Sequence, residues 1–285
     1  MIERTFQKRP RDLGGFTVGR VLPVGGRGVG PFIFFDHMGP AEFQRGLPKS
    51  TDVRPHPHIG LATVTYLMQG EIMHRDSVGS EQAIRPEEVN WMTAGRGITH
   101  SERFEKARAA GDRVHGLQAW VALPEADEEC EPAFAHHGRE SLPTWSDAGV
   151  TARLIAGEAY GLRSPVRTLS PLFYVHAELQ AGARMALPDA YGERAIYVTE
   201  GRVEAEGHAF NAGDMPSFAK GADTTFTALE RSSVMLLGGD PVGPRFIEWN
   251  FVSSRRERIE QAKADWRAGR MKLPDLDNGE FIPLP

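Results

Sequence analysis

The chain has one cysteine in 285 residues, Cys130, so no disulfide can form within it. Cys130 follows Glu128 and Glu129 and precedes Glu131, and negative neighbours disfavour the reactive thiolate form. This shortage of cysteine excludes a disulfide-rich secreted domain and a closed structural zinc site built on thiolates. We therefore expect an intracellular, cytoplasmic protein with an inert thiol.

Long apolar runs are also missing from the sequence. No segment approaches the roughly 20 consecutive apolar residues that a transmembrane helix needs. The first residues, Met1-Ile-Glu-Arg-Thr-Phe, lack the apolar core of a signal peptide. We expect no membrane as a partner.

There is no excess of positive charge either. The formal net charge is −5, which gives no electrostatic reason to expect binding to nucleic acid or to an anionic membrane. An arginine cluster near the C-terminus is interleaved with Glu257, Glu260 and Asp265, as is typical of a solvated helix face. The glycine-rich run at residues 24–30 precedes Pro31 and an apolar strand-like run, which excludes a dinucleotide-binding loop. We expect no direct nucleic-acid partner.

The sequence does contain many short segments rich in Val, Ile, Tyr, Trp and Thr, bounded by glycine, proline or aspartate. Such segments predict β-strands, and many of them in succession predict a sandwich or barrel. The 31 glycines and 20 prolines supply the turns. The expected strands are residues 62–69, 72–76, 89–93 and 114–123, then 173–179, 195–199, 203–206, 224–229 and 234–237.

Two pairs of potential metal ligands lie within this β-rich region: His56 and His58, then His100 and Glu102. Each pair is separated by one residue. On a strand, side chains at positions i and i+2 project from the same face, roughly 6.5 to 7 Å apart. Two neighbouring strands can thus direct three imidazoles and one carboxylate at a single ion. The alternative for a lone histidine, a loop or turn role, does not account for two such pairs.

The type of ligand indicates the class of metal. Imidazole suits iron, zinc, copper and nickel. Three histidines and a glutamate resemble the ligand set of non-haem Fe(II) oxygenases with one additional imidazole, and in octahedral geometry they leave two open positions. We expect one divalent metal, with Fe(II) favoured and nickel, copper, manganese and zinc as alternatives.

The later strands look like a second copy of the earlier ones. Hairpins at Gly70 and Gly201 correspond, as do the segments at Val89 and Met215. This alignment places His56 and His58 over Leu187 and Asp189, and His100 and Glu102 over Phe226 and Ala228. We expect an all-β chain of two barrels, with the metal site in residues 1–140 and a metal-free barrel in residues 141–285. Chance similarity of β-hairpins is the alternative.

One helix is expected near the C-terminus. Ser254 and Glu257 fit a capping box, and Gly269 suits the position after the helix. Apolar residues recur at helical spacing between them, at Ile259, Ala262 and Trp266.

Two further groups of residues leave alternatives open. His74 and Asp76 follow the Gly70 turn; they either orient a metal-bound imidazole or lie on an exposed, paired strand. Asp36 and His37 are candidates to border the site, which spacing alone does not decide.

Four segments resemble the pirin family: residues 55–60, 63–67, 73–77 and, most specifically, Trp91-Met-Thr-Ala-Gly-Arg-Gly-Ile-Thr-His-Ser-Glu102. The resemblance is strong over the first 125 residues and diffuse beyond them. It implies a bicupin, with two β-barrel cupin domains and one metal, usually iron, in the first. The metal ligands of the family fall here on His56, His58, His100 and Glu102.

Two positions depart from the family pattern. Family members usually have an arginine and a glutamate in the segment after the second histidine, where this chain has Ile59 and Ala62. Ala62 removes an acid that many cupins use as a ligand, so the carboxylate role falls to Glu102. Ile59 removes a cation expected near the mouth of the site.

The resemblance implies two classes of function. Some members are similar to quercetin 2,3-dioxygenases, which open a flavonol ring with O₂ and release carbon monoxide. On this hypothesis the partners are a small phenolic substrate and O₂, and Glu102 is both a ligand and the base that removes a substrate proton. An animal relative is a nuclear, iron-dependent transcription cofactor, which makes a metal-dependent binding protein the alternative. A cupin enzyme with a substrate unrelated to flavonols is a third possibility.

Overall fold

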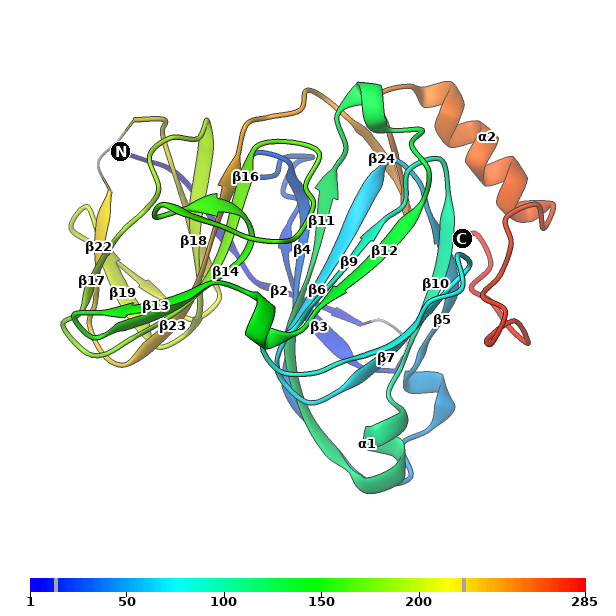
Figure 1. Cartoon of the computed structure of the whole chain (residues 1–285), viewed down its shortest axis with the longest axis horizontal. Helices are drawn as coiled ribbons and strands as arrows, with labels where there is room; N and C mark the ends of the chain where they lie inside the picture. The colour runs from blue at the N-terminus through cyan, green and yellow to red at the C-terminus, as the bar shows by residue number, and fades with distance from the viewer. Residues whose placement is uncertain (13–14, 222–223) are drawn as a thin grey trace. The chain divides into compact units, whose positions relative to one another are not determined.

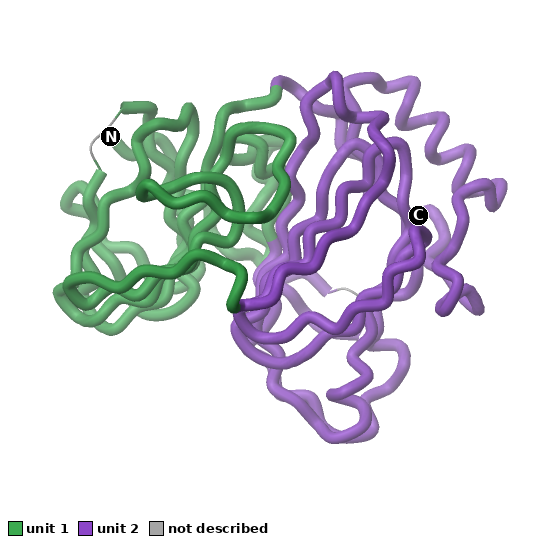
Figure 2. Tube along the Cα trace, in the orientation of Figure 1, with its two compact units in different colours: residues 1–9, 19–35, 140–242 green, residues 10–18, 36–139, 243–285 purple. Residues whose placement is uncertain are grey.

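The structure is a computed structural model that describes residues 1–12, 15–221 and 224–285. It is built mainly from β-strands, as expected for an all-β protein (Figure 1). The described residues form two compact units, shown in Figure 2. Unit 1 contains residues 1–9, 19–35 and 140–242, and unit 2 contains residues 10–18, 36–139 and 243–285.

The two units differ at both ends of the chain from the expected division at 140/141. The first strand groups with unit 1, because β1 (Ile2–Gln7) pairs antiparallel with β21 (Asp214–Phe218). The last 43 residues, 243–285, group with unit 2. They do so because helix α2 (Arg256–Arg267) buries its apolar face there.

Unit 1 is organised around two antiparallel sheets. The larger has the order β1-β21-β18-β23-β16-β14-β13, with β15 paired to β14, and the smaller has the order β17-β22-β19-β20. The remaining bounds are β13 (Thr144–Asp147), β14 (Val150–Ala159), β15 (Leu162–Arg163), β16 (Leu172–Leu179), β17 (Arg184–Ala186), β18 (Glu193–Glu200), β19 (Arg202–Ala205), β20 (His208–Asn211), β22 (Thr225–Ala228) and β23 (Ser232–Gly239).

The interior of unit 1 is an apolar core of valine, leucine, phenylalanine, methionine and alanine side chains. Three of the four residues that align with the candidate ligands belong to this core: Leu187, Phe226 and Ala228. The second copy of the barrel therefore uses these positions for packing.

Unit 2 carries a four-stranded sheet in the order β5-β10-β7-β8 and most of a seven-stranded sheet in the order β12-β9-β6-β11-β4-β3-β2. Strands β2, β3 and β4 have residues in both units. The bounds are β2 (Arg9–Asp12), β3 (Thr17–Leu22), β4 (Phe32–Phe43), β5 (Val53–His58), β6 (Leu61–Gln69), β7 (Ile72–Asp76), β8 (Glu81–Ile84), β9 (Val89–Thr93), β10 (Ile98–Arg103), β11 (Asp112–Ala122), β12 (Ala133–His137), β24 (Phe246–Glu248) and β25 (Phe251–Ser253).

The described residues contain two α-helices, α1 (Glu105–Ala110) and α2, and three 3₁₀ turns, Lys49–Thr51, Glu125–Asp127 and Arg139–Ser141. In α2 the expected apolar stripe is confirmed: Ile259, Ala262 and Trp266 pack with Ile59 and Phe251. No described helix combines the length and the apolar character needed to cross a membrane.

The expected capping box of α2 is wrong. The residue that precedes the helix is Arg255, and no side chain caps it. The Ser254 hydroxyl instead donates a hydrogen bond to Glu128, 2.9 Å away, and the Ser254 amide donates to the same carboxylate. Glu128 also forms a buried ion pair with Arg245. The Glu128 carboxylate therefore anchors the segment before α2 within unit 2. Ser254 binds this carboxylate instead of capping the helix.

Candidate metal centre

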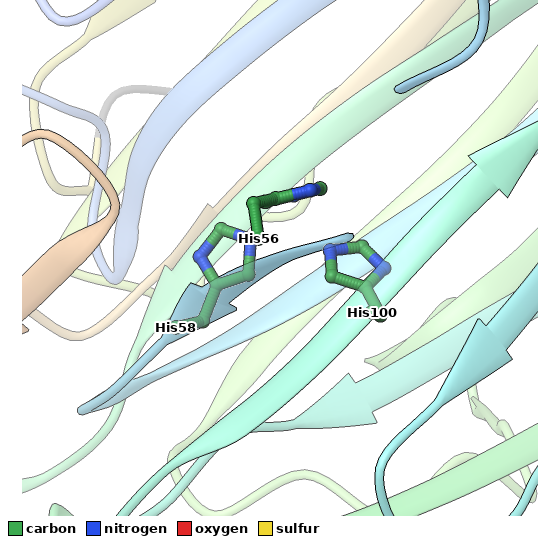
Figure 3. A group of neighbouring side chains, drawn as sticks. All are labelled: His56, His58 and His100. Atoms are coloured by element: carbon green, nitrogen blue, oxygen red, sulfur yellow. The ribbon is translucent and has the colours of Figure 1, made fainter. Parts of the chain in front are cut away.

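Three of the four candidate ligands come together from two paired strands. His56 and His58 lie on β5, and His100 lies opposite His56 on the antiparallel neighbour β10. One ligand nitrogen from each histidine lies within 4.8 Å of the other two (Figure 3). The alternation of side chains along each strand thus produces the convergence that the spacing predicts.

The turn that directly follows the two histidines of β5 requires a glycine. Gly60 has φ +68, and a Cβ there would lie 2.0 Å from the carbonyl oxygen of Val252. Only glycine accepts both the left-handed conformation and this close approach without strain. Ile59, beside it, is 1% exposed and packs against α2 rather than facing solvent. The side chain at this position therefore contributes to packing against the helix.

Backbone carbonyls fix the protonated nitrogen of two histidines. Nδ1 of His56 lies 2.9 Å from the carbonyl oxygen of Arg54, and Nδ1 of His58 lies 3.2 Å from that of Asn250. A carbonyl oxygen only accepts, so each Nδ1–H donates and each Nε2 keeps a lone pair. Nε2 of His58 and Nε2 of His100 are buried without a hydrogen-bond partner among the described residues. Buried polar atoms normally have partners, and a metal ion meets this need.

All three histidines are buried, with exposed fractions of 7% or less. Burial lowers the pKa of His56 to about 4, against a weaker opposing effect of its hydrogen bond to Arg54. Burial, together with the neighbouring histidines, also lowers the pKa values of His58 and His100 well below their ordinary range. The imidazoles are therefore neutral at pH 7, which is the form that binds a metal.

Glu102 lies beside this group but outside it. Its Oε1 atom is 3.9 Å from Nδ1 of His100 and accepts a hydrogen bond of 3.2 Å from Nε2 of Gln118. Thr65 in turn donates to Oε1 of Gln118 at 2.6 Å, which fixes the orientation of the amide. Burial raises the pKa of Glu102 to about 7, despite the opposing hydrogen bond from Gln118. Its carboxyl is thus balanced between its acid and base forms near neutral pH.

The sequence patterns did not predict that Gln118 and Thr65 support Glu102. They lie directly opposite each other on the paired strands β11 and β6. The available indication was a lone glutamine in the otherwise apolar segment 117–122, but its partner depends on the register between two strands. Trp120, two residues further on, meets the ring of His58 edge-on at 5.1 Å between centroids.

His74 and Asp76 are buried, with exposed fractions of 5% and 1%, which excludes the exposed-strand interpretation. Nε2 of His74 lies 2.9 Å from Oδ2 of Asp76, and the His74 ring stacks on Phe134 at 4.4 Å. Burial raises the pKa of Asp76, but hydrogen bonds from His74 and Ser80 outweigh burial, so this pKa lies below its ordinary value.

Asp36 and His37 are buried on β4. His37 pairs with His115 through their Nε2 atoms, 2.7 Å apart, and the two rings are stacked. Neither Asp36 nor His37 belongs to the three-histidine group found in the described part of the chain.

The donor set as a whole fits a divalent transition metal. Three neutral imidazoles converge, two of their Nε2 atoms are buried without partners, and a carboxylate lies alongside. Thiolate is absent, and imidazole with carboxylate is the chemistry of iron, zinc, copper and nickel sites.

Comparison with known proteins agrees with this fold. The Pirin family model matches residues 15–121, and the Pirin C-terminal cupin domain model matches residues 174–272. A pirin-like protein of Caulobacter vibrioides is 65% identical over all of both chains. Human pirin is 33% identical over 85% of this chain and 82% of its own length.

A solved structure has the same fold over nearly the whole chain. The quercetin 2,3-dioxygenase of Acinetobacter baumannii is 32% identical, with a TM-score of 0.90 over 99% of this chain and 94% of its own. The all-β fold with two cupin barrels and a short C-terminal helix is thereby confirmed. The chain belongs to the pirin family.

Proposed function

We propose that this chain is a metal-dependent dioxygenase of flavonol-like phenolic substrates, with Fe(II) as its metal. The observation that carries the proposal is the buried group of three neutral histidines with a carboxylate of raised pKa beside it. The similarity to a structure described as a quercetin 2,3-dioxygenase supports the substrate class.

His56, His58 and His100 would hold the ion through their free ring nitrogens, with Glu102 as the fourth ligand. Glu102 shares a face of β10 with His100, two residues away, and lies 3.9 Å from that ring. When bound, the metal supplies Lewis acidity that favours the substrate's oxyanion and one-electron chemistry with O₂. Nickel, copper, manganese and zinc are alternatives that the same donors accept.

Glu102 would remove the proton from a substrate hydroxyl. A base works best when its pKa lies near the working pH, and burial brings the pKa of Glu102 to about 7 in the absence of a metal. A bound metal would favour the carboxylate form, which is the form that accepts the proton. Gln118, held by Thr65, keeps the carboxylate in place with a hydrogen bond from its amide. Trp120 provides an apolar wall beside His58, which suits a flat aromatic substrate.

The test is anaerobic reconstitution with Fe(II), followed by oxygen uptake and loss of flavonol absorbance with quercetin. We expect turnover in the wild type and its loss in His56→Ala and Glu102→Gln. His208→Ala is a matched control, because His208 is exposed on β20 in the other unit. That variant should retain wild-type turnover.

Absence of turnover in a protein that binds one iron per chain would rule out the flavonol dioxygenase. The alternative is then a metal-dependent binding or regulatory protein, or a cupin enzyme for another substrate. These two are separated by screening phenolic substrates for O₂ uptake.

A further inference from the structure

Each of the three candidate histidine ligands needs its Nδ1 protonated so that Nε2 presents a lone pair. For His56 and His58 this tautomer is imposed by backbone carbonyls, as described above. His100 is different: its Nδ1 faces a side chain, with Nδ1 of His74 at 3.4 Å. The third ligand therefore depends on a group that can itself either donate or accept.

The state of His74 is decided one step further away. Its Nε2 lies 2.9 Å from Oδ2 of Asp76. The other oxygen, Oδ1, accepts hydrogen bonds from the backbone amides of Val78 at 3.0 Å and Ser80 at 2.9 Å. These amides fix which oxygen faces His74. Asp76, His74 and His100 are all buried, so water does not compete for these hydrogen bonds.

We propose that His74, held by Asp76, sets the tautomer of His100 for metal binding. The Asp76 carboxylate only accepts, so Nε2–H of His74 donates to it. In neutral His74, Nδ1 is then an acceptor, and Nδ1–H of His100 donates to it. Nε2 of His100 is left with its lone pair, buried and without a hydrogen-bond partner among the described residues.

Two neighbours complete the surroundings of this chain of hydrogen bonds. Phe134 stacks on the His74 ring with an interplanar angle of 16°, which holds the plane of the ring. Oε1 of Glu102 is 3.9 Å from Nδ1 of His100, beyond hydrogen-bond distance, and is engaged by Gln118. His74 is thus the partner that determines the His100 proton, and it acts as a positioning residue.

The inference rests on the proposed function, in which His100 is a metal ligand. Partners that orient metal-bound histidines typically change metal affinity about 10- to 100-fold when removed. The backbone partners of His56 and His58 cannot be removed by substitution, whereas His74 and Asp76 can.

The sharpest variant is Asp76→Asn. The backbone amides of Val78 and Ser80 still require an oxygen at the Oδ1 position, so the new NH₂ group must face His74. It donates to Nε2 of His74, which then carries its proton on Nδ1 and donates to His100. His100 then favours its Nε2–H form, which has no lone pair on Nε2 for a metal and must change tautomer to bind one, although the substitution is nearly isosteric.

A second pair of variants separates positioning from packing. His74→Gln can donate from its amide to Asp76 and accept from His100, so it should restore the chain. His74→Phe keeps an aromatic ring against Phe134 but has no acceptor. We expect Co²⁺ affinity within about threefold of the wild type for His74→Gln and about 10- to 100-fold weaker for His74→Phe and Asp76→Asn.

Two readouts decide the outcome: ¹⁵N NMR of the histidine rings in the metal-free protein, and titration with Co²⁺. Support is an Nδ1–H His100 in the wild type, its reversal in Asp76→Asn, and the affinities above. An Nε2–H His100 in the wild type, or unchanged tautomer and Co²⁺ affinity in Asp76→Asn, overturns the inference. The expected tautomers without Co²⁺ binding in the wild type would uphold the tautomer assignment and refute the metal site.

Discussion

At the scale of single residues, Glu102 illustrates a conflict between stability and function. Its side chain is 14% exposed, and burial raises its pKa from an ordinary 4.5 to about 7. A buried carboxyl favours its protonated form, and ionising it in the folded protein costs free energy. The proposed role of Glu102 as a base at neutral pH requires this placement, while the metal-free fold is weakened by it.

Glu102→Gln should therefore stabilise the metal-free protein at high pH. Because the folded pKa is raised, the favourable contribution of Glu102 is present below pH 4.5 and is lost as the pH rises through about 7. The gain in unfolding free energy from the substitution should be about 3 kcal/mol larger at pH 8 than at pH 4.5.

Urea denaturation of both proteins at the two pH values, with a chelator present, measures this difference. Comparing variant with wild type at each pH cancels the titration of the other groups. An equal effect of the substitution at both pH values would show that the pKa of Glu102 is not raised. Added metal should reverse the order of stability at pH 8, because it binds the wild type more tightly.

At the scale of elements, the two faces of β10 have separate tasks. His100 and Glu102 face the candidate metal centre, whereas Ser101 and Arg103 contact the C-terminal tail, the segment that follows α2. The Asp277 carboxylate accepts two hydrogen bonds from Arg103, both 2.7 Å, and one from Ser101 at 2.6 Å. The tail also reaches β5, where the Ile282 amide donates to the Pro55 carbonyl. Figure 1 shows this tail, in red, beside β5 and β10.

Asp277→Ala should lower the unfolding free energy by about 3 kcal/mol, because it leaves the buried Arg103 guanidinium without its main partner. Asp275→Ala is the matched control. Asp275 pairs with Lys272 on the surface, both more than half exposed, and its loss should cost less than about 1 kcal/mol. Urea unfolding at pH 7 gives both losses of unfolding free energy. Similar losses for Asp277→Ala and Asp275→Ala would mean that the ion pair of Asp277 with Arg103 does not anchor the tail.

The ion pair between Arg103 and Asp277 should also make the stability of the fold depend on pH. Burial raises the pKa of Asp277, but the hydrogen bonds from Arg103 and Ser101 outweigh it and bring the pKa below 3.8. The stabilisation from Asp277 is thus present above pH 3.8 and is lost as the pH falls below it. The destabilisation by Asp277→Ala should shrink between pH 5 and pH 3, as measured by thermal unfolding.

Several strands around the candidate ligands could be predicted from the sequence because alternation and turn residues act locally. Residues 72–76 and 89–93 coincide with β7 and β9. His56 and His58 on β5 converge with His100 on β10 as the spacing requires, whereas Glu102 lies beside this group. Contacts between distant segments were not predictable in this way. The tail on β10, Glu128 on Ser254, and Gln118 on Glu102 each depend on register or on a chain end that no periodicity describes.

At the scale of the whole chain, the candidate metal ligands all lie in unit 2, whereas most of the aligned positions in unit 1 belong to its apolar core. The three histidines, Glu102, the residues that orient them and the tail all belong to unit 2. In unit 1 three of the four aligned positions are filled by buried apolar residues, among them Phe226, which is fully buried. A barrel that holds no metal needs an interior filled by side chains, and the core of unit 1 meets this need.

Phe226→Ala should therefore destabilise the chain without changing the metal site. Removing a buried phenylalanine costs about 3–5 kcal/mol through lost burial and the remaining cavity. The Co²⁺ dissociation constant should stay within about twofold of the wild-type value, because no candidate ligand or orienting residue lies in unit 1.

Ile196→Val, with an expected cost of about 1 kcal/mol in the same core, serves where Phe226→Ala does not fold. Thermal unfolding and Co²⁺ titration of both variants measure the two effects separately. A tenfold loss of Co²⁺ affinity in the folded Ile196→Val variant would show that unit 1 shapes the metal centre, and its role would then extend beyond packing.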